Sequence, residues 1–158
     1  MEELIKWANE LLIDITFIEV MPMEETDTSR HLQFIPLDEV FSNLSKKFHF
    51  NKIDKNTGGP AVYYASKLLS INVGFITPIT NNFCSSCNRI RISSTGKLFM
   101  CLGQNDYIDF REILRNDRSD DFIKEKIQLG LKTKPLKHDF LIEKDSVPYM
   151  KRHMNVTG

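Results

Sequence analysis

Two neighbouring runs of sequence decide how this chain is interpreted: Phe83-Cys84-Ser85-Ser86-Cys87-Asn88-Arg89-Ile90-Arg91-Ile92 (residues 83–92) and Lys97-Leu98-Phe99-Met100-Cys101 (residues 97–101). Together they contain all three cysteines of the chain. Polar and apolar residues alternate in both runs, which is typical of β-strands with one face toward a core. The rest of the sequence is interpreted as support for this region.

The two runs are predicted to form a β-hairpin, because Ser93-Ser94-Thr95-Gly96 between them is a turn signal. Pairing of Ser93 with Lys97 fixes the register of the strands. This register places two further pairs opposite one another: Arg91 with Phe99, and Arg89 with Cys101. Cys87 then lies one pair further along, within roughly 10 Å of Cys101.

The same register assigns each residue to one face of the hairpin, since side chains alternate along a strand. One face carries the reactive and charged groups, namely Cys87, Arg89, Arg91, Lys97, Phe99 and Cys101. The other face is wholly apolar and is expected to be core: Ile90, Ile92, Leu98, Met100 and Leu102. A slip of one residue would separate the cysteines onto opposite faces.

Three cysteines, two of them spaced CxxC, indicate a metal site in a reducing compartment rather than a disulfide framework. Such thiolates hold zinc or an iron–sulfur cluster. A structural zinc ion needs a fourth ligand, and the histidines lie far away in sequence: His31, His49, His138 and His153. A cubane cluster on three cysteines leaves one iron open, and the neighbouring cations Arg89, Arg91 and Lys97 would attract an anion.

Ordinary explanations of these residues remain open. A CxxC pair is often a zinc knuckle or a pair of plain thiols, and alternating arginines on a strand are usually a solvated face. The methionines are core residues by default. Glu19 lies in an apolar run, where a carboxylate is more often hydrogen-bonded within the structure than a catalytic base.

The composition indicates one soluble globular domain of α and β elements. Hydrophobic residues make up 41% of the 158 residues and charged residues 27%. Lys plus Arg and Asp plus Glu both total 21, so the charge predicts no nucleic-acid partner, and no apolar run is long enough for a membrane span. The acidic start, Met1-Glu2-Glu3, is unlike a signal peptide, so the expected location is the cytoplasm.

Apolar periodicity predicts where the elements lie. Helices are predicted at residues 4–12, 37–48, 108–114 and 120–131, the last of them capped by Ser119. Strands are predicted at residues 13–21, 48–53, 62–65 and 71–79, and short links between the last three favour antiparallel pairing. Residues 24–33 are predicted to form a loop, residues 140–142 a last strand and residues 147–158 a flexible end.

The cysteine region resembles the C-terminal cluster motif of the GTP 3′,8-cyclases, radical-SAM enzymes of molybdenum cofactor biosynthesis (molybdenum cofactor biosynthesis protein A). The resemblance rests on Cys84-x2-Cys87-Asn88-Arg89-Ile90-Arg91 and continues through Gly96-Lys97-Leu98 to Cys101-Leu102. Four other stretches are similar to family segments: residues 17–22, 59–61, 74–78 and 134–140. The similarity therefore covers nearly the whole chain.

The resemblance implies a role for each matched residue. Cys84, Cys87 and Cys101 would hold a [4Fe-4S] cluster whose open iron meets the GTP base, and Arg89, Ile90 and Arg91 would contact GTP. Met21 matches a methionine that lines the S-adenosylmethionine site. The implied activity is that of a lyase, which rearranges GTP through a radical generated at a first cluster, and the intact enzyme would be a homodimer.

The sequence departs from the family pattern in three places. The N-terminal CxxxCxxC motif that generates the radical does not occur here, so this chain is expected to be inactive without an N-terminal radical-SAM barrel. Thr16 stands where the family commonly has arginine. The sequence ends in a single glycine, Gly158, where the family tail has two.

The resemblance and the predicted elements together give the expected fold class, α+β. Residues 1–36 would be the remnant of an incomplete α/β (TIM-like) barrel edge, formed by a helix and the last barrel strand. Residues 37–158 would be a C-terminal domain that binds the cluster and GTP, with a mainly antiparallel sheet, the hairpin and C-terminal helices. Two alternatives remain: a non-catalytic zinc-binding module, and the auxiliary-cluster region of another radical-SAM enzyme.

Overall fold

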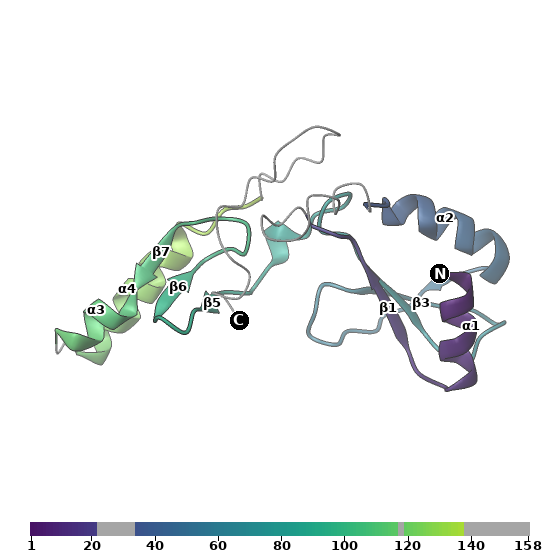
Figure 1. The fold of residues 1–158 in the computed structure, drawn as a ribbon, viewed down its shortest axis with the longest axis horizontal. Coiled ribbons are helices and arrows are strands. Elements are labelled where there is room, and N and C mark those ends of the chain that lie inside the picture. Colours follow the sequence, from purple (N-terminus) through teal and green to yellow (C-terminus); the bar gives the residue numbers. More distant parts are fainter. Residues whose placement is uncertain (22–33, 117–118, 138–158) are drawn as a thin grey trace. The chain divides into compact units, whose positions relative to one another are not determined.

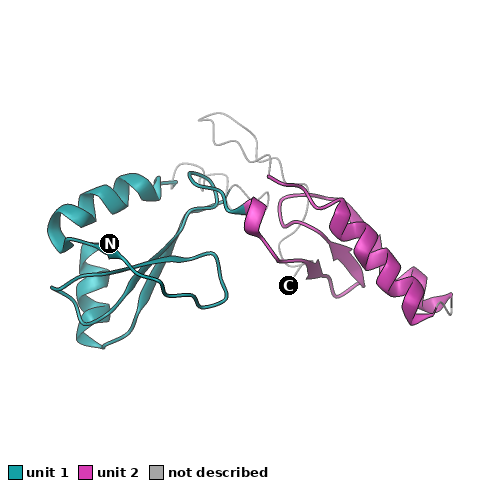
Figure 2. Ribbon diagram, turned by 180° about the vertical axis from the view of Figure 1, so that it is seen from behind, with its two compact units in different colours: residues 1–21, 33–83 teal, residues 22–32, 84–158 magenta. Residues whose placement is uncertain are grey.

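A computed structural model describes residues 1–21, 34–116 and 119–137. The chain divides into two compact units (Figure 2). Unit 1 comprises residues 1–21 and 33–83, and unit 2 comprises residues 22–32 and 84–158. Within the described ranges, no helix is long and apolar enough to cross a membrane. The predicted strand at residues 140–142 and the predicted loop at residues 24–33 lie outside the described residues.

Unit 1 contains two helices and one four-stranded sheet (Figure 1). In chain order the elements are α1 (Glu2–Glu10), β1 (Ile15–Ile18), α2 (Leu37–Phe48), β2 (Asn51–Lys52), β3 (Val62–Ala65) and β4 (Val73–Ile76). Each of these elements falls within or close to a stretch for which its type was predicted. Strand β3 has the predicted bounds, whereas β1, β2 and β4 are shorter than predicted, because the strand-like runs of sequence continue past the last paired residue.

The sheet of unit 1 has the strand order β1-β4-β3-β2. Strands β2, β3 and β4 pair antiparallel, which confirms the prediction from their short links. Strand β1 pairs parallel with β4, and Thr16 lies opposite Gly74. The interpretation of this parallel pair as the edge of a barrel stays a prediction, as does the predicted domain boundary after residue 36.

The core of unit 1 lies between the helices and the sheet. Its buried residues come from α1, α2 and β4: Ile5, Leu37, Leu44, Phe48, Val73 and Phe75. Partly buried aromatic rings extend this core. The centre of the Phe41 ring lies 4.5 Å from the centre of the Tyr64 ring and 5.4 Å from that of the Phe75 ring. Tilted and edge-on ring pairs of this kind add to the stability gained by burial.

Unit 2 contains a three-stranded antiparallel sheet with the order β5-β6-β7, followed by two helices (Figure 1). The elements in its described residues are the short 3₁₀ helix η2 (Cys84–Ser86), β5 (Arg91–Ile92), β6 (Lys97–Phe99), β7 (Tyr107–Asp109), α3 (Phe110–Arg115) and α4 (Asp120–Lys132). The antiparallel hairpin and the C-terminal helices were predicted. Residues 107–109 were not predicted as a strand, and the helix expected from residue 108 begins at Phe110.

Helix α4 has the N-terminal cap that the sequence predicts. The Ser119 hydroxyl accepts a hydrogen bond from the backbone N–H of Phe122. Near its C-terminal end the helix approaches the sheet closely at Gly130. A Cβ atom there would lie 2.6 Å from Cδ1 of Ile108 and 2.9 Å from Cε of Met100. The absence of a side chain at Gly130 therefore allows α4 to pack directly on the sheet.

Candidate site around the three cysteines

The hairpin register predicted from the turn is confirmed. Arg91 pairs with Phe99 and Ile92 with Leu98, and the N–H of Ser93 donates to the carbonyl of Lys97 at 2.9 Å. Gly96 closes the turn with a φ of 81°, a left-handed conformation that glycine adopts without strain. The turn thus fixes which residues of the two strands face each other.

The ladder between β5 and β6 is shorter than predicted. It ends at the pair Arg91 and Phe99, so the predicted pair of Arg89 with Cys101 lies beyond it. Cys87 does not continue the strand, because residues 84–86 form η2 and the N–H of Cys87 donates to the carbonyl of Cys84 at 3.2 Å. The two CxxC thiols are therefore presented by a tight turn.

The predicted division of the hairpin into a core face and a chemical face is wrong at three positions. Ile92 is 60% exposed and Ile90 39% exposed, although both were assigned to the core. Phe99 was assigned to the chemical face and is only 3% exposed. The physical reason is that β5 is the edge strand of the sheet, whereas β6 lies between β5 and β7 and is covered on both faces.

The three cysteines are free thiols, and all are partly buried. The Cys101 sulfur accepts a hydrogen bond from the N–H of Gly103 at 3.4 Å. Among the residues that the structure describes, no three cysteine, histidine, aspartate or glutamate side chains lie close enough together to hold a metal ion. The donor type and number thus suit a metal cluster, but the described arrangement is not a closed set of ligands.

A lysine that was not predicted as a site residue lies beside Cys87. The ammonium group of Lys134 donates to the carbonyl of Arg89 at 2.6 Å and to that of Met100 at 2.8 Å. Its Nζ is also 3.7 Å from the sulfur of Cys87. In the sequence Lys134 is marked by the proline that follows it and by the similarity of residues 134–140 to a family segment, and neither signal indicates its distant partners.

The cations predicted to attract an anion differ in their surroundings. Arg89 is exposed and Arg91 is partly buried. The Lys97 ammonium lies 4.0 Å from the centre of the Tyr107 ring, a cation–π contact that gives this charge a local partner.

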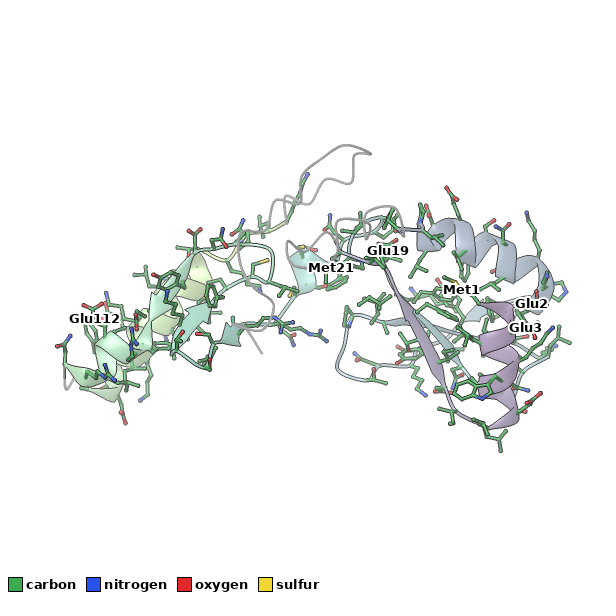
Figure 3. The ribbon with its side chains drawn as sticks, viewed as in Figure 1. Met1, Glu2, Glu3, Glu19, Met21 and Glu112 are labelled. Atoms are coloured by element: carbon green, nitrogen blue, oxygen red, sulfur yellow. The ribbon has the colours of Figure 1, made fainter. Side chains whose placement is uncertain are left out.

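Glu19 and Met21, both in unit 1, follow the end of β1 (Figure 3). Glu19 is 3% exposed, and its carboxylate accepts hydrogen bonds from the N–H groups of Leu37 at 3.1 Å, Ile79 at 2.8 Å and Thr80 at 3.0 Å. It also accepts a hydrogen bond from the Thr80 hydroxyl. The interpretation of Glu19 as a structural carboxylate is thus confirmed. Met21 is partly buried, and its predicted role at S-adenosylmethionine stays a prediction.

The fold and the site define an α+β protein with three thiols at the open end of a short hairpin. The family model described as Molybdenum Cofactor Synthesis C matches residues 13–140, and the chain belongs to that family. It is 45% identical over 157 residues to the GTP 3′,8-cyclases of Brucella ovis, Brucella canis and Brucella suis. These matches cover 99% of this chain and 46% of each relative, so the chain spans about half their length. The resemblance predicted from the cysteine motif is confirmed.

Proposed function

We propose that this chain is the C-terminal part of a GTP 3′,8-cyclase in molybdenum cofactor synthesis and provides the cluster-binding and GTP-binding side of that enzyme. The observation that carries the proposal is the 45% identity to GTP 3′,8-cyclases along 99% of the chain. An unrelated protein that merely shared a CxxC pair would not match over such a length. The activity proposed for the whole enzyme is that of a lyase.

In this proposal, Cys84, Cys87 and Cys101 are the protein ligands of a [4Fe-4S] cluster. The three thiols lie on two segments of unit 2, at η2 and directly after Met100, and metal binding would draw these segments together. A cluster held by three cysteines supplies an iron without a protein ligand, to which a substrate can bind. The chain contributes the thiolates and the partly buried surroundings of the site.

The proposed GTP contacts are Arg89, Ile90 and Arg91. A guanidinium group offers several N–H donors in a planar arrangement, which suits phosphate oxygens and the acceptor atoms of a guanine base. Arg89 is exposed and lies two residues after Cys87, so its side chain is available beside the proposed cluster. The 39% exposed Ile90 side chain offers an apolar surface between the two arginines.

The proposed protein partner is an N-terminal radical-SAM barrel. Strand β1 is at one edge of its sheet, where a further strand can pair. Four large apolar residues of α1, its C-cap and β1 are about half exposed: Leu4, Trp7, Leu11 and Ile18. Exposed apolar groups beside an open strand edge are typical of a protein interface. The S-adenosylmethionine site with Met21, the homodimer and the cytoplasmic location belong to the same proposal for the whole enzyme.

Anaerobic reconstitution with iron and sulfide tests the cluster, read out by iron, sulfide and zinc analysis and by absorption spectra. The expected result is about four irons per chain, lost when any of the three cysteines becomes serine. Stoichiometric zinc without iron would instead favour the zinc-binding module. Retention of the iron by the Cys101→Ser variant would remove Cys101 from the ligand set.

Titration of the reconstituted protein with GTP tests the substrate. The combined change Arg89→Ala plus Arg91→Ala is expected to weaken GTP binding about a hundredfold, because two charge-assisted contacts are lost. Arg115→Ala is the matched control, since Arg115 is an exposed arginine of the same unit. Undiminished affinity in the double variant would exclude these arginines from the GTP site.

A further inference from the structure

The open end of the hairpin is not held by pairing between its two strands. The β5–β6 ladder ends at the pair Arg91 and Phe99. The proposed metal ligands lie beyond that pair, Cys87 four residues before Arg91 and Cys101 two residues after Phe99. The described strand pairing therefore does not set the spacing of these two segments, and contacts from other elements contribute to it.

Lys134 makes such contacts. Its ammonium donates to a carbonyl on each side of the opening, that of Arg89 at 2.6 Å and that of Met100 at 2.8 Å. The third contact is to the Cys87 sulfur at 3.7 Å. An ammonium has three N–H donors, so the three contacts engage all of them. Hydrogen bonds from a charged donor are stronger than those between neutral groups.

The end of α4 holds Lys134 at this place. Gly130 is buried against Met100 and Ile108, which brings the last turn of the helix onto the sheet. The helix ends at Lys132, and the Thr133 hydroxyl donates to the carbonyl of Gly130 at 2.8 Å. Pro135 disfavours a helical conformation for the residue before it. Lys134 therefore leaves the helix directly beside the hairpin opening.

We propose that Lys134 is a positioning residue that clamps the open end of the hairpin and sets the spacing between the Cys87 and Cys101 segments. The clamp itself rests on the geometry of unit 2. Its consequence, that it prepares the cysteines to receive a metal, rests on the proposed function. Lys134 takes no part in chemistry. It differs from a lysine that blocks the site, because its shortest contacts are to backbone carbonyls on both sides rather than to sulfur.

Amide hydrogen exchange of the metal-free chain tests the clamp directly. In the Lys134→Met variant, amides of residues 86–91 and 100–103 are expected to exchange about tenfold faster, because the opening loses its cross-link. The turn amides of Ser93 and Gly96 should be unchanged. Lys134→Arg is expected to restore much of the protection, since a guanidinium also donates to two carbonyls. Lys137→Met, an exposed lysine nearby, is the control. Equal exchange in Lys134→Met and the unchanged chain would overturn the proposal.

Titration with Co²⁺ alone tests the consequence, because thiolate ligands give Co²⁺ a charge-transfer absorption that does not depend on enzyme activity. Lys134→Met is expected to weaken Co²⁺ binding about tenfold, and Lys134→Arg to recover it in part. Tighter Co²⁺ binding by Lys134→Met would mean that the lysine blocks the site, and would overturn the proposal. If the unchanged chain binds no Co²⁺ through its cysteines, the proposed metal site fails, while the exchange measurement still decides the clamp.

Discussion

Unit 1 is held by a core of aromatic and aliphatic side chains that spans two helices and a four-stranded sheet, and one buried carboxylate joins its loops. In unit 2 three consecutive hydrophobic residues are buried: Leu98 and Phe99 of β6, and Met100 directly after it. In the described part of unit 2, the contacts near the cysteines include the turn in which the N–H of Cys87 donates to the carbonyl of Cys84, and the hydrogen bonds of the Lys134 ammonium. Unit 1 is thus built on an apolar core, whereas polar contacts hold the described segments that carry the thiols.

The largest loss of stability in this comparison is expected in unit 1 from Glu19→Ala. Three backbone N–H groups lose their acceptor, and two of them, on Ile79 and Thr80, share one carboxylate oxygen. The free energy of unfolding should fall by about 3–5 kcal/mol, because buried donors left unpaired are costly. Urea unfolding, with segment-resolved hydrogen exchange to identify the unit, measures the change.

Two variants make the Glu19 result specific. Glu19→Gln keeps one acceptor oxygen but turns an NH₂ group toward backbone donors, so it should recover only part of the loss. Glu39→Ala removes an exposed carboxylate from the same unit and should change stability by less than about 0.5 kcal/mol. If Glu19→Ala were as harmless as Glu39→Ala, the carboxylate would not join the loops of unit 1.

A smaller loss, of about 2–3 kcal/mol, is expected in unit 2 from Leu98→Ala, because its side chain is 1% exposed and its removal leaves a cavity. Ile92→Ala is the matched control. Ile92 is the direct cross-strand partner of Leu98 but is 60% exposed, so the same kind of truncation should cost about 0.5 kcal/mol. Hydrogen exchange should locate both changes in unit 2. Equal losses would mean that Ile92 is as buried as the sequence pattern predicts.

A loss of about 1–3 kcal/mol is expected in unit 1 from Gly74→Ala, which overpacks the sheet rather than emptying a core. A Cβ at this position would lie 2.6 Å from Oγ1 of Thr16 and 2.9 Å from Cε1 of Tyr63, residues on the two flanking strands. Thermal unfolding measures the change. Adding Thr16→Ala should restore part of the stability, since it removes one of the two clashes. If Thr16→Ala restored no stability, the strain would lie at Tyr63 alone.

The sequence predicted the features that depend on near neighbours. The turn from Ser93 to Gly96 fixed the hairpin register, and the Ser119 cap and the helical periodicity located α4. The helix expected from residue 108 begins two residues late, because Tyr107-Ile108-Asp109 pairs with β6 and tertiary pairing overrides a short apolar pattern. Local signals were therefore sufficient wherever the partner lay within a few residues.

Features set by distant residues could not be predicted. The exposure of Ile92 depends on β5 being an edge strand, and alternation along a strand does not contain that information. The parallel pairing of β1 with β4 joins residues far apart in the chain. Lys134 is 34 residues from Met100 and 47 from Cys87, and no periodic pattern connects them. The cysteine motif indicated the site, but only the fold identified what holds its two sides.

The smallest expected effect is a pH-dependent one at the surface of unit 1. There the Asp14 carboxylate forms an ion pair with Lys55, and it accepts a hydrogen bond of 2.8 Å from the backbone N–H of Asn72. Partial burial raises the pKa of Asp14, but hydrogen bonds from Lys55 and Asn72 outweigh it and hold the pKa below its ordinary value. A lowered pKa in the folded state stabilises the fold above the unfolded-state pKa of about 3.9, and this contribution is lost as the pH falls through the folded-state value.

Asp14→Asn should therefore cost about 0.5–1 kcal/mol at pH 7, a small amount because the pair is partly exposed, and the difference from the unchanged chain should shrink as the pH falls below about 4. Urea unfolding across this range measures it. Lys55→Met should cause a similar loss at pH 7, and combining both changes should cost little more than either alone, because they remove the same interaction. Full additivity, or a difference that persists at low pH, would show that the two side chains stabilise unit 1 independently of their mutual contact.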